Sequence, residues 1–206
     1  MVEIIEYKLL KWYHIHNPND EDIAYLKNNF HFHPLDLEDC LSKTQRPKID
    51  IYKEYLFTIL HFPHFDKQQK FMCTNEVKIF WGMDYIITIG NVHWVVRDLF
   101  SNCSENEQVK EELMCRSSDF LFYKILERLL HESFKHLSCV GDEIEFINSV
   151  LFTRHTRDTI ERMSVTRRNV ILLDTIFKPQ LRVFRLFESG DIKGFAEKMD
   201  VYWGNI

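Results

Sequence analysis

The sequence predicts an α/β fold, a sandwich in which helices flank a central mixed sheet and two long antiparallel helices follow. Three observations support this class. Segments with the two-residue period of strands lie in the first half of the chain. After Val92 the apolar residues instead repeat about every 3.6 residues, the period of a helix. From Ser117 onward this helical period dominates. We therefore divide the chain into a mixed-sheet α/β part (residues 1–116), a long helical hairpin packed on it (117–190) and the start of a further helix (191–206).

The sheet part begins with one strand and one helix. Apolar and polar residues alternate over Trp12–His16, as in a strand, and Asn19 or Asp20 opens a helix that runs to Phe30. Four later segments have strand character, and turn residues at 65–70 and 82–84 separate the last three. These segments are Ile49–Ile51, Tyr55–Phe62, Phe71–Phe80 and Tyr85–Ile89. A mixed or antiparallel sheet with helices on its faces is expected.

A short acidic helix is expected to begin at Pro34, between these segments. Proline suits the first helical position because that residue needs no N–H partner, and negative charge near a helix start is stabilising. The acidic residues are Asp36, Glu38 and Asp39. Ser42–Gln45 then interrupts the helical pattern, and Pro47 precedes the strand. Taken alone, this acidic turn is typical of a well-capped helix.

Two apolar stripes predict the helical hairpin. The first consists of Phe122, Leu126, Leu129, Leu137, Val140, Ile144, Ile147 and Leu151. The second consists of Ile160, Met163, Val170, Phe177, Leu181, Phe184 and Phe187. Pro179 is expected to kink the second helix because it has no N–H, and Gly190 is expected to end it. A further helix begins at Asp191 and stops at the end of the chain.

Composition and charge exclude several classes of protein. The net charge of −5 gives no general basic surface for nucleic acid, and the aromatic content of 14% argues against disorder. The five cysteines include no CxxC pair, so we expect free thiols in a reducing compartment. Charged residues interrupt the long apolar run Val77–Ile89, and no segment approaches the roughly 18 to 20 residues of a spanning helix. As given, the chain is expected to be soluble.

Motifs of catalysis are absent from the sequence. His131 and His136 lie five residues apart and so miss the four-residue spacing of a helical metalloprotease motif. There is no nucleophile elbow or phosphate-binding glycine loop. We therefore predict that the chain is not an enzyme. There are two histidine pairs, His14 with His16 and His31 with His33, and each would place its imidazoles on one face of an extended segment. A zinc site therefore stays a candidate, although no third ligand is apparent nearby.

The segment His33–Leu56 contains His33-Pro34-Leu35, the acidic pair Glu38-Asp39, Gln45-Arg46-Pro47-Lys48 and Tyr55 in an aromatic-rich strand. In these features it resembles the cytoplasmic N-terminal domain of CorA-type divalent-cation transporters. The resemblance implies an α/β domain with two long helices beside its sheet, followed by a long stalk helix that enters the membrane. Neither the membrane segments nor the Gly-Met-Asn pore signature is present here, so we expect a fragment that ends inside the stalk.

The resemblance also implies a set of metal-binding residues. Asp39 matches the acidic residue that faces the stalk helix of the adjacent protomer across a bound cation, and Glu38 matches its neighbour in a second site. Glu127 falls where the family helix contributes another carboxylate, there an aspartate. On the stalk, the family's carboxylate position is Trp203, with Asp200 about one turn earlier. The partner carboxylate is thus displaced or missing.

By this resemblance the chain is the regulatory domain of a Mg²⁺ transporter or channel. It would lie at the cytoplasmic face of the cell membrane, assemble as a homopentamer in the full-length protein, and gate ion flux by sensing intracellular divalent cation. Mg²⁺ is the expected regulatory ion, since it binds through one or two carboxylates and keeps several waters. Zn²⁺ and Co²⁺ are the other candidates. The alternatives are the same domain of a zinc-transporting relative and a soluble adaptor that reuses the fold.

Overall fold

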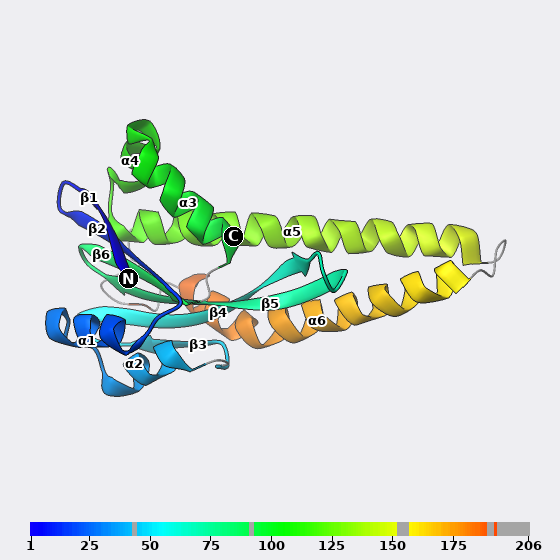
Figure 1. Ribbon diagram of the computed structural model, residues 1–206, viewed down its shortest axis with the longest axis horizontal. Helices are drawn as coiled ribbons and strands as arrows, with labels where there is room; N and C mark the ends of the chain where they lie inside the picture. Colours follow the sequence, from blue (N-terminus) through cyan, green and yellow to red (C-terminus); the bar gives the residue numbers. More distant parts are fainter. Residues whose placement is uncertain (43–44, 91–92, 152–156, 189–191, 193–206) are drawn as a thin grey trace.

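The computed structural model describes residues 1–42, 45–90, 93–151, 157–188 and 192. These residues form a mixed sheet with helices on both faces and a long helical hairpin that extends beyond it (Figure 1). The strands are β1 (Val2–Tyr7), β2 (Leu10–His16), β3 (Lys48–Ile51), β4 (Tyr55–Asp66), β5 (Phe71–Gly82) and β6 (Tyr85–Gly90). The helices are α1 (Asp20–Asn29), α2 (Pro34–Leu41), α3 (Trp94–Glu105), α4 (Glu107–Met114), α5 (Ser118–Leu151) and α6 (Arg157–Glu188).

The sheet has the strand order β1-β2-β6-β5-β4-β3. Neighbouring strands are antiparallel except for β2 and β6, which run parallel with Trp12 opposite Ile86. The predicted mixed sheet is therefore confirmed. β4 and β5 form a long hairpin whose register joins Tyr55 to Gly82 and Asp66 to Phe71. This hairpin reaches past both of its neighbours, since β3 pairs only as far as Ile59 and β6 pairs only with the carboxyl-terminal part of β5.

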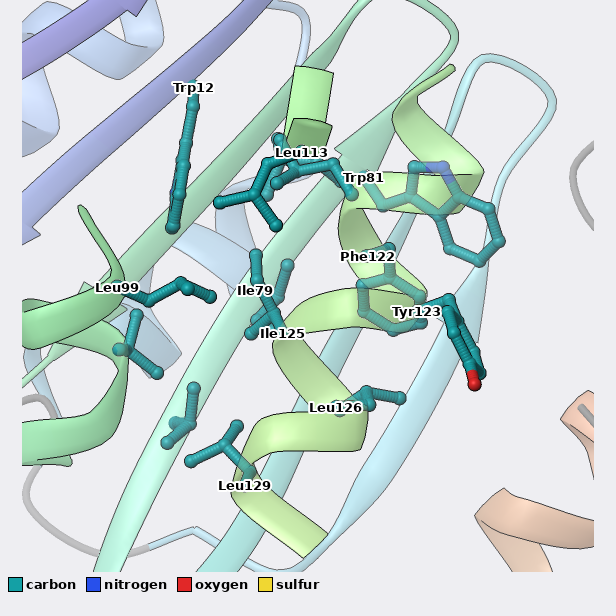
Figure 2. Packing of buried hydrophobic residues seen from close by; sticks show 14 of the residues in the cluster. Trp12, Ile79, Trp81, Leu99, Leu113, Phe122, Tyr123, Ile125, Leu126 and Leu129 are labelled. Carbon is teal, nitrogen blue, oxygen red and sulfur yellow. The ribbon is translucent and has the colours of Figure 1, made fainter. Parts of the chain in front are cut away.

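Consecutive residues of the central strands enter two different cores, because side chains of a strand alternate between its faces. Trp12, Trp81 and Ile86 face α3, α4 and α5, and Figure 2 shows Trp12 and Trp81 among Leu99, Leu113 and Phe122 of these helices. The residues adjacent to them along the strands pack under α1 and α2 in the second core. These are Tyr13, Phe80 and Ile87, with Leu26, Phe32 and Leu37 opposite them. The α/β/α arrangement follows from this alternation, as predicted.

The amino-terminal strand β1 was missed by the sequence analysis. Its residues Val2–Tyr7 do not alternate strictly, because Ile4 and Ile5 are adjacent, and only Ile5 is buried. As an edge strand, β1 needs to bury just one side chain, which leaves a weak signal. Between Val92 and Ser117 the sequence indicates a helical period but no division into helices. This segment forms the separate helices α3 and α4.

The predicted apolar stripe of α6 is wrong in part. Ile160, Met163, Val170 and Leu181 are exposed, while Thr166, Asn169 and Gln180 are buried. On α5, Leu137 and Ile144 are also exposed. The reason is geometric: Leu137, Ile144, Val170 and Leu181 line an open groove between α5 and α6 instead of a closed seam, and the far part of the hairpin extends past the sheet, where each helix has mainly the other to pack against (Figure 1).

Two predictions for the second helix concern a kink at Pro179 and an end at Gly190. α6 continues from Arg157 to Glu188 as one helix with Pro179 inside it. The end at Gly190 and the further helix expected over 191–206 lie outside the described residues, except for Ile192, which is buried in the core with Phe187 and Val183.

Candidate functional site

The short helix α2 turns two of its carboxylates toward the first residue of β3. His33 caps the helix, because its Nδ1 accepts a hydrogen bond from the N–H of Leu35 at 3.3 Å. Asp36 and Asp39 lie three residues apart and therefore share one face of the helix. Both are within 4 Å of the Lys48 ammonium, Asp39 at 2.7 Å and Asp36 at 3.8 Å. We call Asp36, Asp39, Lys48 and Asp50 the carboxylate corner.

Lys48 is the cation at the centre of the carboxylate corner. Its Nζ lies 2.7 Å from Asp39 Oδ2 and 2.5 Å from Asp50 Oδ2. Asp50 contributes because residues two apart on a strand share a face. Burial alone favours the neutral amine, but the bonds to Asp39 and Asp50 outweigh it and raise the pKa of Lys48 above its ordinary value. Three carboxylates therefore meet one firmly charged ammonium.

Asp36 is the deepest member of the corner, with a side chain that is 0% exposed. The Tyr55 hydroxyl donates a hydrogen bond to its Oδ2 at 2.9 Å and itself accepts one from the His33 N–H at 2.8 Å. Burial raises the pKa of this carboxyl, and the hydrogen bonds from Tyr55 and Tyr52 oppose that rise without cancelling it. Oδ1 has no hydrogen-bond partner and faces Lys48.

A second lysine, which unlike Lys48 is buried, fixes the carboxyl-terminal end of α2. Lys78 of β5 donates hydrogen bonds to the carbonyls of Cys40 at 3.3 Å and Ser42 at 2.9 Å, and pairs with Glu76 at 2.9 Å. A cation suits this place because helix ends leave carbonyls unpaired and carry partial negative charge. Glu76 also accepts the N–H of Gln45 at 2.7 Å. The orientation of α2, and with it of Asp39, is thus set from both ends.

The structure separates the other predicted site residues from the corner. Glu38 is exposed on α2, so its side chain lies outside the contacts of Lys48. Glu127 lies on α5, across the sheet from α2 (Figure 1). There it accepts a hydrogen bond from Tyr123 at 2.6 Å and pairs with Lys124 at 2.7 Å. Within one chain, Asp39 and Glu127 are therefore not brought together.

The carboxyl of Glu127 is kept ionised by its own helix neighbours. Burial raises the pKa of Glu127, but the hydrogen bonds from Lys124 and then Tyr123 outweigh it, and the pKa is lowered. Asp200 and Trp203, the two positions considered for the stalk partner of Asp39, lie outside the described residues.

Among the described residues, neither histidine pair finds a third metal ligand. No group of three or more His, Cys, Asp or Glu side chains in the described part of the chain is placed to hold a metal ion, and this includes the three aspartates of the carboxylate corner. His14 is buried with Nδ1 at 2.9 Å from Thr88 Oγ1, and His33 serves as the cap of α2. His136 lies 4.0 Å from Glu132 on the same helix. The five cysteines are free thiols, as predicted.

Sequence reasoning singled out Asp39 but missed the two carboxylates that share its lysine. The sequence analysis assigns Asp36 only to the negative charge that stabilises the start of the helix, and it assigns no role to Asp50. The available signal was spacing: Asp36 lies one helical turn from Asp39, and Asp50 lies two residues from Lys48 on a strand. Neither spacing predicts that α2 and β3 lie next to each other.

The mixed sheet with its long helical hairpin is an architecture shared with a class of solved domains. The structure resembles the soluble domain of CorA from Methanocaldococcus jannaschii with a TM-score of 0.73 at 19% identity, over 95% of this chain and 80% of that one. It also resembles the ZntB cytoplasmic domain from Vibrio parahaemolyticus, with a TM-score of 0.73 at 14% identity over 97% and 77% of the two chains.

Sequence comparison places the chain within this class. The model of the family described as CorA-like Mg²⁺ transporter protein matches residues 7–206, and the chain belongs to that family. It is 28% identical over 148 residues to YfjQ of Bacillus subtilis, named for metal ion transport, covering 71% of this chain and 44% of that protein. It is 25% identical over 145 residues to the cobalt/magnesium transport protein CorA of Thermotoga maritima, covering 70% and 40%.

Two further facts accompany this family membership. The chain spans less than half the length of these two curated relatives. No helix among the described residues is both long and apolar enough to cross a membrane. The family is one of transporters rather than of enzymes.

Proposed function

We propose that this chain is the cytoplasmic regulatory domain of a CorA-like Mg²⁺ transporter, and that it senses intracellular divalent cation and gates ion flux. The observation that carries the proposal is the carboxylate corner, in which three aspartates converge on a single ammonium in a chain of this family. The full-length protein would be a homopentamer in the cell membrane, with this domain on the cytoplasmic side.

The charge of the corner supports binding of a divalent cation. Asp39 is only partly exposed, at 19%, and its carboxylate is oriented by Lys48. Carboxylate oxygens are the ligands that Mg²⁺ prefers, and one or two of them suffice when water completes the shell. Asp39 would face the neighbouring protomer, with Glu38, Glu127 and a stalk residue such as Asp200 completing the interprotomer sites.

Gating requires that the cation bind the closed and the open assembly with different affinities. A cation that bridges carboxylates of neighbouring protomers offsets their repulsion and binds the closed ring more tightly than the open one. Raising cytoplasmic Mg²⁺ then shifts the population toward the closed, non-conducting state. The transported ion, Mg²⁺ or Co²⁺, would pass through the membrane segments of the full-length protein.

Limited proteolysis of the full-length protein tests this function. Mg²⁺ should protect the assembled protein from cleavage, and Asp39→Ala should abolish the protection. Glu112→Ala is the matched control, because Glu112 is an exposed carboxylate on α4, away from the corner. Protection that survives Asp39→Ala would remove Asp39 from the sensor. Equal conduction at low and high cytoplasmic Mg²⁺ would contradict the gating role itself.

The zinc-transporting alternative is tested by calorimetry. The ZntB domain shares the fold, but no described histidine pair gains a third ligand. Zn²⁺ binding that is tighter than Mg²⁺ binding, and lost in His14→Gln or His33→Gln, would favour that alternative. Absence of membrane segments in the full-length gene would favour the adaptor.

A further inference from the structure

We propose that the Lys48 ammonium and a divalent cation are alternative occupants of the Asp39 carboxylate, so that the cation binds as Lys48 leaves. The lysine would act as a tethered competitor that sets the cation concentration at which the sensor responds. This inference rests on the proposed function, because it requires that Asp39 bind the cation.

The first observation is that Lys48 already fills the position in front of Asp39. Its Nζ lies 2.7 Å from Asp39 Oδ2 and contacts Asp50 Oδ2 as well. Mg²⁺ approaches its oxygen ligands to about 2.0–2.1 Å and brings several waters with it. An ammonium and a hydrated dication cannot share this space, and their like charges repel at such short range.

The second observation is the buried oxygen of Asp36. Oδ1 is without a hydrogen-bond partner, its side chain is 0% exposed, and it lies 3.8 Å from Lys48 Nζ. Tyr55 holds the other oxygen of the same carboxylate at 2.9 Å. The oxygen is therefore fixed and aimed at the place that Lys48 occupies. A buried acceptor of this kind is costly unless a cation stands near it.

The corner can exchange one cation for another because Lys48 has a route to solvent. Its side chain is 32% exposed, and a lysine carries its charge on a flexible four-carbon stem. When the ammonium moves into water, Asp36, Asp39 and Asp50 are left without their shared cation. The negative charge left on the corner attracts a dication more strongly than a monovalent ion. Asp39 would be the direct ligand, together with water and groups of the neighbouring protomer, because the three aspartates of one chain are not placed to hold a metal ion by themselves.

The exchange has a reciprocal consequence. If bound Mg²⁺ weakens the hold of the corner on Lys48, then removal of the Lys48 charge tightens Mg²⁺ binding by the same factor. Lys48→Met, which keeps the length of the stem, should lower the Mg²⁺ dissociation constant of the full-length protein about tenfold at fixed ionic strength, as is typical of coupling between two sites. Lys48→Arg keeps the charge and should bind Mg²⁺ no more tightly than the unaltered protein.

Lys110→Met is the matched control for loss of a paired lysine. Lys110 pairs with Glu107 at 2.8 Å on α4, away from the corner, and its removal should leave Mg²⁺ affinity unchanged. Asp39→Ala is titrated alongside. If Asp39→Ala weakens binding while Lys48→Met leaves it unchanged or weakens it, the inference is overturned and the proposed function stands. If Asp39→Ala leaves Mg²⁺ binding unchanged, the proposed function is contradicted, and with it the inference that rests on it.

A second measurement uses the unaltered protein, so that it holds even if Lys48→Met fails to fold. Acetylation of each lysine by an activated ester is followed by mass spectrometry with and without Mg²⁺. The Lys48 amine should react several-fold faster when Mg²⁺ is bound, because it has been released to water, while Lys110 should react equally in both. Saturation by Mg²⁺ with no change at Lys48 would show that both cations are held together, and would overturn the inference.

Discussion

His14 lies on β2 with its imidazole almost completely buried, and its surroundings set its protonation. The side chain is 2% exposed and stacks on Phe100 with a ring-centroid distance of 4.8 Å. Burial, followed by the charges of His16 and Arg97, lowers the pKa of His14 to about 4. The folded protein therefore holds this ring neutral at pH values where the unfolded chain binds a proton.

This pKa predicts a loss of stability in mild acid. Because the folded-state pKa is depressed below 6.5, the contribution of His14 is complete above pH 6.5 and is lost as the pH falls toward about 4. Over that window the loss should be about 3 kcal/mol. Urea unfolding of the unaltered chain and of His14→Gln between pH 7 and pH 4 measures it. The two curves should converge at low pH, and parallel curves would contradict the assignment.

The corner shows what sequence can and cannot predict about single residues. Asp39 and Lys48 were both singled out, each as part of a motif, but their ion pair was not foreseen. The contact depends on how β3 joins the sheet edge beside α2, which no local period encodes. Likewise, the acidic start of α2 is helix-start chemistry in sequence, and becomes a candidate site only because Asp36 is buried against Tyr55.

At the scale of elements, two side-chain amides join α6 to the β4–β5 hairpin. Gln180 is fully buried; its Oε1 accepts the N–H of His61 at 2.7 Å, and its Nε2 donates to the His61 carbonyl at 2.8 Å. Asn169 Oδ1 accepts the N–H of Met72 at 3.0 Å. Both amides bond backbone groups of the β4–β5 hairpin, in the part that extends beyond the neighbouring strands β3 and β6. Polar residues are therefore buried on α6, against the apolar prediction.

Removal of the Gln180 amide should destabilise the chain strongly. Gln180→Leu keeps the approximate volume but leaves the partly buried N–H and C=O of His61 without these partners, at a cost of up to about 1–3 kcal/mol for each group. Lys178→Ala, two residues away, breaks an exposed pair with Asp174 and should cost under about 1 kcal/mol. Urea unfolding compares the two variants. Similar losses in both would mean that the amide is not an anchor.

An ion pair between α5 and α6 stabilises the far end of the helical hairpin. Arg162 of α6 bonds Glu143 of α5 through Nε at 2.7 Å and Nη2 at 2.8 Å, and its guanidinium lies 3.9 Å from the Phe146 ring centroid. The hydrogen bond from Arg162 lowers the pKa of Glu143. Both side chains are about one-third exposed, so this pair acts locally.

Arg162→Met should therefore loosen the hairpin end without unfolding the domain. We expect faster amide hydrogen exchange near the ends of α5 and α6, and a change of under about 1 kcal/mol in the free energy of global unfolding. Arg162→Lys keeps the charge but loses the two-pronged geometry, so its exchange should be intermediate. Exchange that is unchanged in Arg162→Met would show that packing alone holds the helix ends.

At the scale of the whole molecule, the layers were predictable and the extent of the hairpin was not. The near-continuous apolar runs of β4, β5 and β6 indicate a sheet buried on both faces, and helices had to cover both. Nothing in the period of α5 or α6 indicates where the sheet beneath them ends. The predicted stripes therefore run the full length of both helices, whereas residues such as Leu137 and Val170 are exposed and line an open groove between α5 and α6.

The overall charge yields a prediction that separates specific binding from screening. Each chain carries a formal net charge of −5, so any salt that screens repulsion between copies would stabilise an assembly to some degree. A cation bound to the folded assembly adds a term that grows with the logarithm of its concentration, about 2.7 kcal/mol at a hundred times its dissociation constant. In the full-length protein, Mg²⁺ should therefore raise the unfolding temperature more than KCl of equal ionic strength. Asp39→Ala should reduce the Mg²⁺ effect to that of KCl, whereas equal effects of the two salts on the unaltered protein would leave screening as the whole explanation.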